Sequence, residues 1–175
     1  MMRFRTILPA AGFALGFTLA AAVPAAGEDV MPVRPTAPIA IDQNIFNGKA
    51  KGFVPPSEVM LSTKLLDMAW TGFFAASDAS TVVGYVNDLA AMPTLKLGDV
   101  IDMASGNTAV DYQAMEAKWP PASVVVVAVV SFDADRRHGT VSGFASLRID
   151  KIESKGNPKY IDSTLVGLVP TTLVP

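Results

Sequence analysis

The chain has 175 residues, of which 50% are hydrophobic and none is cysteine, and its formal net charge is −2. This length is sufficient for one domain with a packed core, while the lack of cysteine excludes disulfides, a thiol nucleophile and a lipid-bearing cysteine. The small negative charge disfavours nucleic acid and anionic membrane surfaces as partners.

The first 27 residues follow the order of a secretory signal peptide. Arg3 and Arg5 precede an apolar run, and small residues follow that run up to Gly27. This order predicts cleavage near residue 26 or 28 and a periplasmic or secreted mature protein. An uncleaved anchor is the alternative, although the apolar run is short for a membrane span. No later segment has the apolar length of a span, so we expect no stable transmembrane span in the mature chain.

The rest of the chain divides by composition into a linker, a domain and a tail. Residues 28–44 contain Pro32, Pro35 and Pro38 and lack hydrophobic periodicity, which predicts an extended Pro-rich linker. Residues 45–170 are predicted to form a single α+β domain, and residues 171–175 a short tail.

The first half of the domain is predicted to be helical. Residues 57–74 place apolar side chains at every fourth position, which is typical of an amphipathic helix. Residues 81–92 form a second predicted helix that ends before Pro93, with a strand through its valines as the alternative. A short third helix is expected over residues 108–118, where a Trp-Pro-Pro sequence ends it.

The second half of the domain is predicted to be β-rich. Residues 123–132 contain an unbroken apolar run of β-branched type, as expected of a central strand covered on both faces. A polar turn over residues 133–139 leads to residues 140–150, where apolar and polar residues alternate. Phe144 lies on the polar face, so we expect a helix to cover it; a contact surface is the alternative. Further strands are predicted over residues 95–103 and 160–169.

These elements predict an α+β fold. Its antiparallel β-sheet, either open or closed like a barrel, lies in the C-terminal half and packs against helices from the N-terminal half.

Residues with catalytic or metal-binding chemistry are few. The single histidine, His138, lies in the polar turn beside Arg136 and Arg137, so we expect a solvated side chain rather than a general base paired with Asp133 or Asp135. The two aspartates lack the further oxygen ligands of a calcium loop, and the arginines would repel a divalent ion. The sequence contains no nucleotide-binding loop and no nucleophile elbow. We therefore predict no catalytic residue, no metal and no cofactor.

Several short landmarks occur in a characteristic order between residues 95 and 169. They are Leu97-Gly98-Asp99-Val100-Ile101, Ser105-Gly106-Asn107, Asp111-Tyr112, Gly143-Phe144-Ala145, Arg148-Ile149-Asp150 and Pro158-Lys159-Tyr160-Ile161. This order resembles the C-terminal region of TadG-like proteins, which belong to the tight-adherence (Flp) pilus assembly system. Such proteins usually carry an uncleaved membrane helix and often a long preceding domain, and this chain departs from them in both respects. The family has no known catalytic residues, so the resemblance implies an envelope or pilus-biogenesis context and no reaction.

The sequence thus predicts an exported, non-enzymatic envelope protein that acts through protein contacts, with an envelope or pilus-assembly protein as its partner. The candidate contact residues are Phe144, Tyr160, Arg136 and Arg137. The final strand, residues 160–169, would add backbone groups to this surface if it lay at a sheet edge.

Two alternatives remain open. In the first, the chain is a periplasmic small-molecule-binding module whose pocket lies between a helix carrying Trp70 and Phe73 and the sheet. In the second, it is a small periplasmic enzyme that uses Asp99, Asp102 and Asp111 as acid and base.

Overall fold

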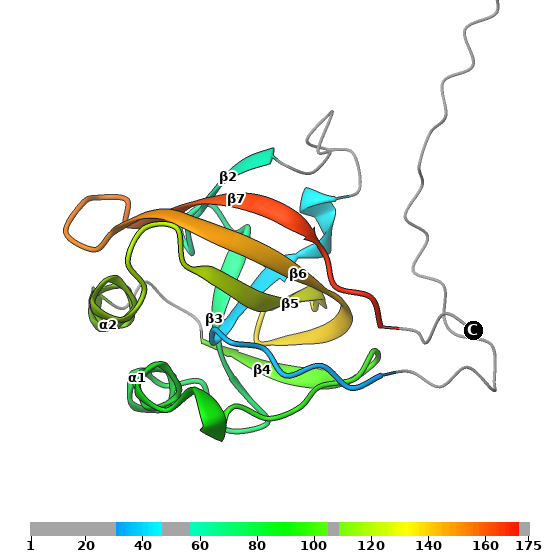
Figure 1. Ribbon diagram of the computed structural model, residues 1–175. Helices are drawn as coiled ribbons and strands as arrows, with labels where there is room; N and C mark the ends of the chain where they lie inside the picture. Colours follow the sequence, from blue (N-terminus) through cyan, green and yellow to red (C-terminus); the bar gives the residue numbers. More distant parts are fainter. Residues whose placement is uncertain (1–30, 47–56, 105–108, 172–175) are drawn as a thin grey trace, which may run out of the picture.

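A computed structural model of the chain describes residues 31–46, 57–104 and 109–171 (Figure 1). The predicted signal peptide, residues 1–27, lies outside these ranges. The described residues form the strands β1 (Ile39–Asp42), β2 (Ser57–Leu61), β3 (Met68–Phe73), β4 (Val100–Ala104), β5 (Val124–Phe132), β6 (His138–Glu153) and β7 (Tyr160–Leu168), the helices α1 (Ala79–Asn87) and α2 (Ala109–Lys118), and the short 3-10 helices η1 (Gln43–Ile45) and η2 (Leu89–Ala91).

The strands form one sheet with the order β2-β7-β6-β4-β3-β1-β5, in which β5 also pairs with β6. That last pairing makes β6, β4, β3, β1 and β5 a ring of hydrogen-bonded neighbours, while β7 and β2 extend the sheet beyond it. Strand β1 runs parallel to β5, and the other pairings are antiparallel. The predicted α+β class with a largely antiparallel sheet is confirmed, although β1, β2 and β3 from the first half of the chain also belong to the sheet.

Strand β6 connects the ring to the extension because it is 16 residues long. Along residues 139–148 it pairs with β5. It also pairs with β4 near its start, where Thr140 lies opposite Val100, and with β7 towards its end, where Glu153 lies opposite Tyr160. The predicted strand of residues 140–150 is therefore confirmed and extends further at both ends.

Two apolar clusters pack against opposite faces of the central strands. Val125, Val127 and Val129 of β5 belong to a cluster that includes α1 and α2, which we call the helix-side cluster. Ala128 and Val130 belong to a second cluster, the Phe144 cluster, built mainly from β1, β3, β4, β6 and residues 92–95. Strand β5 is thus covered on both faces, as its unbroken apolar run predicts.

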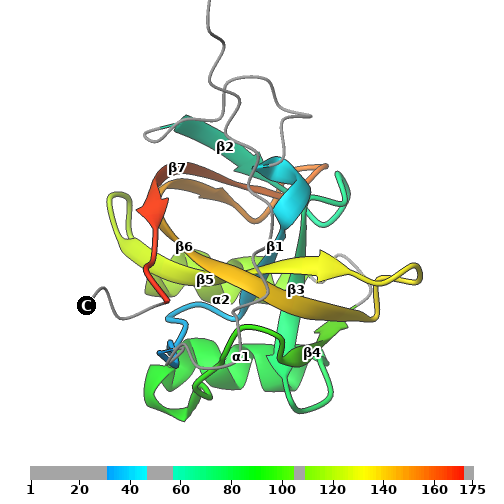
Figure 2. The same cartoon turned by 90° about the vertical axis from the view of Figure 1, so that its right-hand side faces the viewer.

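Both helices lie on the same side of the strands (Figures 1 and 2) and contact each other. Helix α1 begins at an aspartate cap, because the Asp78 carboxylate accepts the Thr81 N–H at 2.8 Å. Its Val82 and Val86 enter the helix-side cluster, as do Tyr112 and Met115 of α2. The predicted helices over residues 81–92 and 108–118 are therefore confirmed with shifted ends. Among the described residues, no helix has the length and apolar character needed to cross a membrane.

The helix predicted over residues 57–74 is wrong, because this segment forms β2, a turn and β3. A four-residue apolar spacing fits a helix, but it is also a multiple of the two-residue period of a strand. Strand β3 is buried on both faces, so it lacks the alternation that would have identified it. Trp70 contacts Tyr112 edge-on, with ring centroids 4.9 Å apart, which anchors the centre of β3 against α2.

The predicted linker of residues 28–44 is also corrected, since its last part forms a strand of the sheet. Ile39, Ala40 and Ile41 belong to β1 and are buried between β3 and β5. Upstream, Val33 and Leu95 exchange two backbone hydrogen bonds of 2.8 Å, so the domain begins before residue 45. The strand escaped prediction because it spans four residues and directly follows a proline-rich segment.

Candidate functional site

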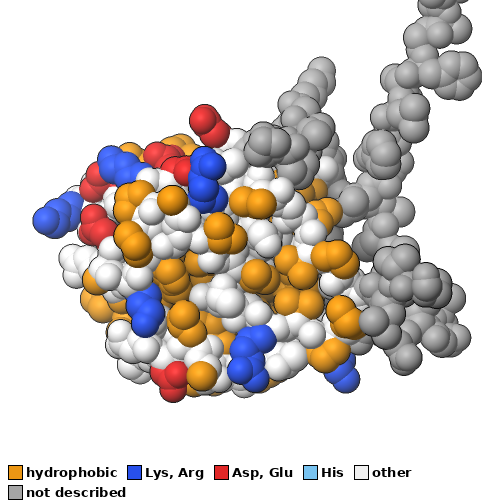
Figure 3. Space-filling view, viewed as in Figure 1, with side chains coloured by type: hydrophobic (Ala, Val, Ile, Leu, Met, Phe, Trp, Pro, Cys, Tyr) orange, Lys and Arg blue, Asp and Glu red, His pale blue; other side chains and the backbone are white. Residues whose placement is uncertain are grey.

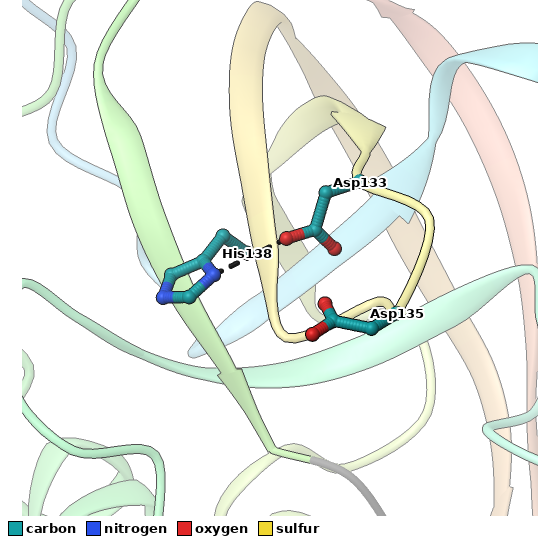
Figure 4. Close-up of side chains that lie close together, drawn as sticks. All are labelled: Asp133, Asp135 and His138. Atoms are coloured by element: carbon teal, nitrogen blue, oxygen red, sulfur yellow. Dashed lines mark hydrogen bonds and ion pairs between the residues drawn. The ribbon is translucent and has the colours of Figure 1, made fainter.

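Asp133, Asp135 and His138 come together at the turn between β5 and β6 (Figure 4). The Asp133 N–H donates to the His138 carbonyl at 3.1 Å and thereby closes the turn. On the ring of His138, Nδ1 lies 3.2 Å from Asp133 Oδ2, and Nε2 lies 3.3 Å from Asp102 Oδ1 on β4. The histidine therefore lies between a carboxylate of the β5–β6 turn and a carboxylate of β4.

This cluster is shallow. The His138 side chain is 52% exposed, and an open pocket of about 340 Å³ beside it is lined by Phe132, Asp133 and Thr140 among others. Partial burial acts to raise the pKa of Asp133, but hydrogen bonds from His138 and Asp135 outweigh it and hold the pKa below its usual range. The 52% exposed side chain of His138 agrees with the solvated position expected from the sequence.

Imidazole and carboxylate ligands within 4.8 Å of one another match the donor set of a divalent metal ion. In this structure each donor already has a protein partner. Both nitrogens of His138 face carboxylates, and Asp135 accepts the Arg137 N–H at 3.0 Å. Ordinary turn chemistry and surface ion pairs account for the arrangement, so it does not by itself indicate a metal site.

A second candidate surface covers the outer face of β2, β7 and β6. It contains a pocket of about 600 Å³ lined by Glu58, Val59, Met60, Arg148, Asp150, Asp162 and Ser163. Charged side chains of both signs gather over this part of the molecule (Figure 3). Met60 of β2 is 46% exposed and lies opposite Asp162 in the register, so an apolar side chain borders the charged pocket.

Arg148 is held in this pocket by two neighbours. Its Nε donates to Asp150 Oδ1 at 2.8 Å, and its terminal amino group donates to Thr164 Oγ1 at 3.0 Å. The Thr164 hydroxyl in turn donates to Asp150 Oδ2 at 2.6 Å. The hydrogen bonds from Thr164 and then Arg148 lower the pKa of Asp150, which favours the ionised carboxylate beside the Arg148 guanidinium.

The predicted contact residues do not form one surface. Phe144 is 1% exposed at the centre of its cluster, and strands with residues 92–95 cover it more than a helix does. Tyr160 is half-buried opposite Glu153 at the end of β6, whereas Arg136 and Arg137 precede the first residue of β6. Phe144 is therefore corrected to a core residue, and Tyr160 lies at the opposite end of β6 from the arginines.

The final strand is not a sheet edge either. Strand β7 lies between β6 and β2, so β2 occupies the end of the strand order. The sequence places the edge at the last strand because the apolar spacing of residues 57–61 fits a helix, and no sequence pattern indicates that they pair with that strand.

The residues named for the two alternative sites lie in other settings than expected. Trp70 and Phe73 have no exposed surface and lie on strand β3, so the helix expected to carry them is wrong. Asp99 accepts the Lys96 N–H at 2.7 Å, and Asp102 faces His138, whereas Asp111 is fully buried on α2. In the described ranges, the single cluster of three acid or histidine ligands within 4.8 Å includes neither Asp99 nor Asp111.

Sequence reasoning missed the environment of Asp111. Both carboxylate oxygens are buried and accept no hydrogen bond from a described residue. Burial raises the pKa of Asp111 to about 6. Its position in the first turn of α2 favours a negative charge, but this dipole effect is small beside the cost of burying a carboxylate.

Comparisons of the chain with protein-family models, with curated protein sequences and with solved structures gave no match.

Proposed function

We propose that this chain is an exported, non-enzymatic protein of the cell envelope that acts by binding another envelope protein, in the setting of tight-adherence pilus assembly. The N-terminal pattern of Arg3, Arg5 and the following apolar run supports export. The landmarks between residues 95 and 169 support the pilus setting through their resemblance to the C-terminal region of TadG-like proteins.

One structural observation carries the binding role. Among the described strands, β2 is at the end of the sheet, and its own Met60 side chain is 46% exposed. A strand edge next to exposed apolar residues is a common docking surface for proteins. The cluster of Asp133, Asp135 and His138 is instead shallow, and ordinary turn chemistry explains its contacts.

The test is cross-linking in the native host followed by mass spectrometry, together with an adherence assay of a deletion strain. The proposal predicts recovery of a defined envelope or pilus-assembly protein and reduced surface adherence. Normal adherence of the deletion strain, with no envelope partner recovered, would contradict it.

Binding of a small molecule is the second candidate, and the 600 Å³ pocket on β2, β7 and β6 favours it. This volume lies within the range of small-molecule sites. It ranks second because such sites are mostly apolar and enclosed, whereas this pocket is open and its lining is mainly polar and charged. A thermal-shift screen of cationic and neutral metabolites would support it if one compound stabilised the protein and Asp162→Ala, which removes a carboxylate of the pocket lining, abolished the effect.

A further inference from the structure

We infer that β2 binds an extended segment of the partner as an added strand, and that this segment places a basic side chain opposite Glu58 and an apolar side chain opposite Met60. The inference rests on the proposed function, because it specifies how the partner is held.

Within the described part of the chain, the backbone of β2 is paired along one side only. Among the described residues its pairing partner is β7, with Ser57 opposite Leu165 and Leu61 opposite Ile161. A strand paired on one side presents unpaired N–H and C=O groups on the other. Edge strands are often protected by lysine or proline, and the Ser-Glu-Val-Met-Leu sequence of β2 contains neither.

The two faces of β2 differ in chemistry. Leu61 is fully buried and Val59 packs against the helix-side cluster, so these two side chains point towards the core. Glu58 and Met60 are exposed on the other face. A strand added next to β2 would follow the same alternation. Its apolar side chains would face the core, and the side chains between them would lie on the outer face next to Glu58 and Met60.

The charges of the outer face select a basic segment. Three carboxylates, those of Glu58, Asp150 and Asp162, line the pocket together with Arg148. Asp150 already pairs with Arg148 at 2.8 Å. Neither Glu58 nor Asp162 forms an ion pair with a described residue. A lysine or arginine from an added strand would supply the missing positive charge, whereas an acidic segment would be repelled.

The experiment is an NMR titration of the full chain, labelled with ¹⁵N, with two synthetic peptides. The first is the acetylated and amidated heptapeptide Thr-Lys-Val-Val-Val-Lys-Thr, whose outer face reads Lys-Val-Lys in either strand direction. The second replaces both lysines with glutamate. The expected result is binding of the lysine peptide about fivefold tighter than the glutamate peptide, because one peptide places an opposite charge and the other a like charge opposite Glu58. The largest shifts should fall on the amides of residues 57–61.

Charge reversal provides the decisive variant. Glu58→Lys should weaken binding of the lysine peptide about fivefold or more and reverse the preference between the peptides. The matched control is Asp135→Lys, which makes the same change of charge in the exposed β5–β6 turn and should leave both affinities unchanged. Circular dichroism of both variants establishes that they are folded.

Equal binding of the two peptides, or shifts confined to other strands, would overturn the inference. So would retention of the lysine preference by a folded Glu58→Lys variant. If neither peptide binds while cross-linking in the host still recovers an envelope partner, strand addition is wrong and the proposed function stands. If the peptides behave as expected while the deletion strain adheres normally, β2 binds basic segments but the pilus setting is wrong.

Discussion

The guanidinium carbon of Arg136 lies 3.8 Å from the ring centroid of Phe132, so the arginine of the β5–β6 turn stacks on the last residue of β5. The same group donates a hydrogen bond of 2.7 Å to the Leu66 carbonyl and lies 3.6 Å from a carboxylate oxygen of Asp42. One side chain therefore ties this turn to the end of β1 and to the turn between β2 and β3.

Replacement of Arg136 should weaken the fold more than replacement of its neighbour. We expect Arg136→Ala to lower the free energy of unfolding by about 1–2 kcal/mol, because it removes a cation–π contact, a hydrogen bond to a carbonyl and an ion pair. Arg137→Ala is the control, since the Arg137 side chain is 73% exposed and pairs with Asp135 at 3.8 Å; its effect should stay below about 0.5 kcal/mol. Urea unfolding measures both, and equal effects would contradict the joining role of Arg136.

A charge in the centre of β5 should unfold the protein. Val127 has no exposed surface and belongs to the helix-side cluster, so Val127→Asp should cost about 4 kcal/mol or more. Val124→Asp is the matched control on the same strand, because Val124 is 60% exposed and lies opposite Arg148, which can pair with the new carboxylate. Thermal unfolding followed by circular dichroism should show a lost or strongly lowered transition for the first variant alone.

The buried carboxylate of Asp111 should make stability depend on pH. The pKa of Asp111 in the folded protein, about 6, lies above the ordinary value of 3.8. The free energy of unfolding should therefore fall progressively as the pH rises from about 4 to 6 and the buried carboxyl ionises. Asp111→Asn removes this cost. We expect the free energy of unfolding of the variant, relative to that of the wild type, to be about 1–2 kcal/mol higher at pH 7 than at pH 4.

The comparison requires urea unfolding of both proteins at the two pH values. The same substitution at the exposed Asp135 should change stability by less than about 0.5 kcal/mol at either pH. A difference between wild type and Asp111→Asn that is the same at pH 4 and pH 7 would show that the Asp111 carboxylate has a partner in the folded protein.

His138 should be dispensable, in contrast to the residue that follows it. Because the contacts of His138 with Asp102 and Asp133 are half-exposed, His138→Ala should cost less than about 1 kcal/mol and leave partner binding unchanged. At Gly139, an added Cβ would lie 2.8 Å from Met103 Cε and 3.0 Å from Val130 Cβ, so Gly139→Ala should cost about 1–3 kcal/mol through overpacking. Melting temperatures of the two variants test this order, and a loss of binding in a folded His138→Ala would revive a functional role for the ring.

The strands of the second half could be predicted because their local pattern and their environment agree. The valine run of residues 124–130 is apolar on both faces, and both faces of β5 are indeed covered. The first half was harder to predict because its strands are short or doubly buried. Ile39, Ala40 and Ile41 give too few positions for a period to emerge, and β3 has no polar side to mark its alternation.

The candidate site could be predicted only in part. The nearness of His138 and Asp133 follows from a local turn, whereas the contact of His138 with Asp102 depends on the pairing of β4 with β6. The position of β2 beside β7 joins segments about a hundred residues apart, as in the hydrogen bond of 3.1 Å from the Ser163 hydroxyl to the Val59 carbonyl. Such long-range pairings are decided by the complementarity of whole faces, which periodicity within one segment does not report.

The long strand β6 has a consequence for how the molecule opens. It pairs with β4, β5 and β7, so its release would break the ring and would also separate β7 and β2 from the other strands. Amides in the middle of β6 should therefore exchange with solvent deuterium only through global unfolding. Among the described strands β2 pairs with β7 only, so we expect its amides to exchange through local opening. The slowest and the fastest exchanging strands of the sheet should thus be separated by a single strand.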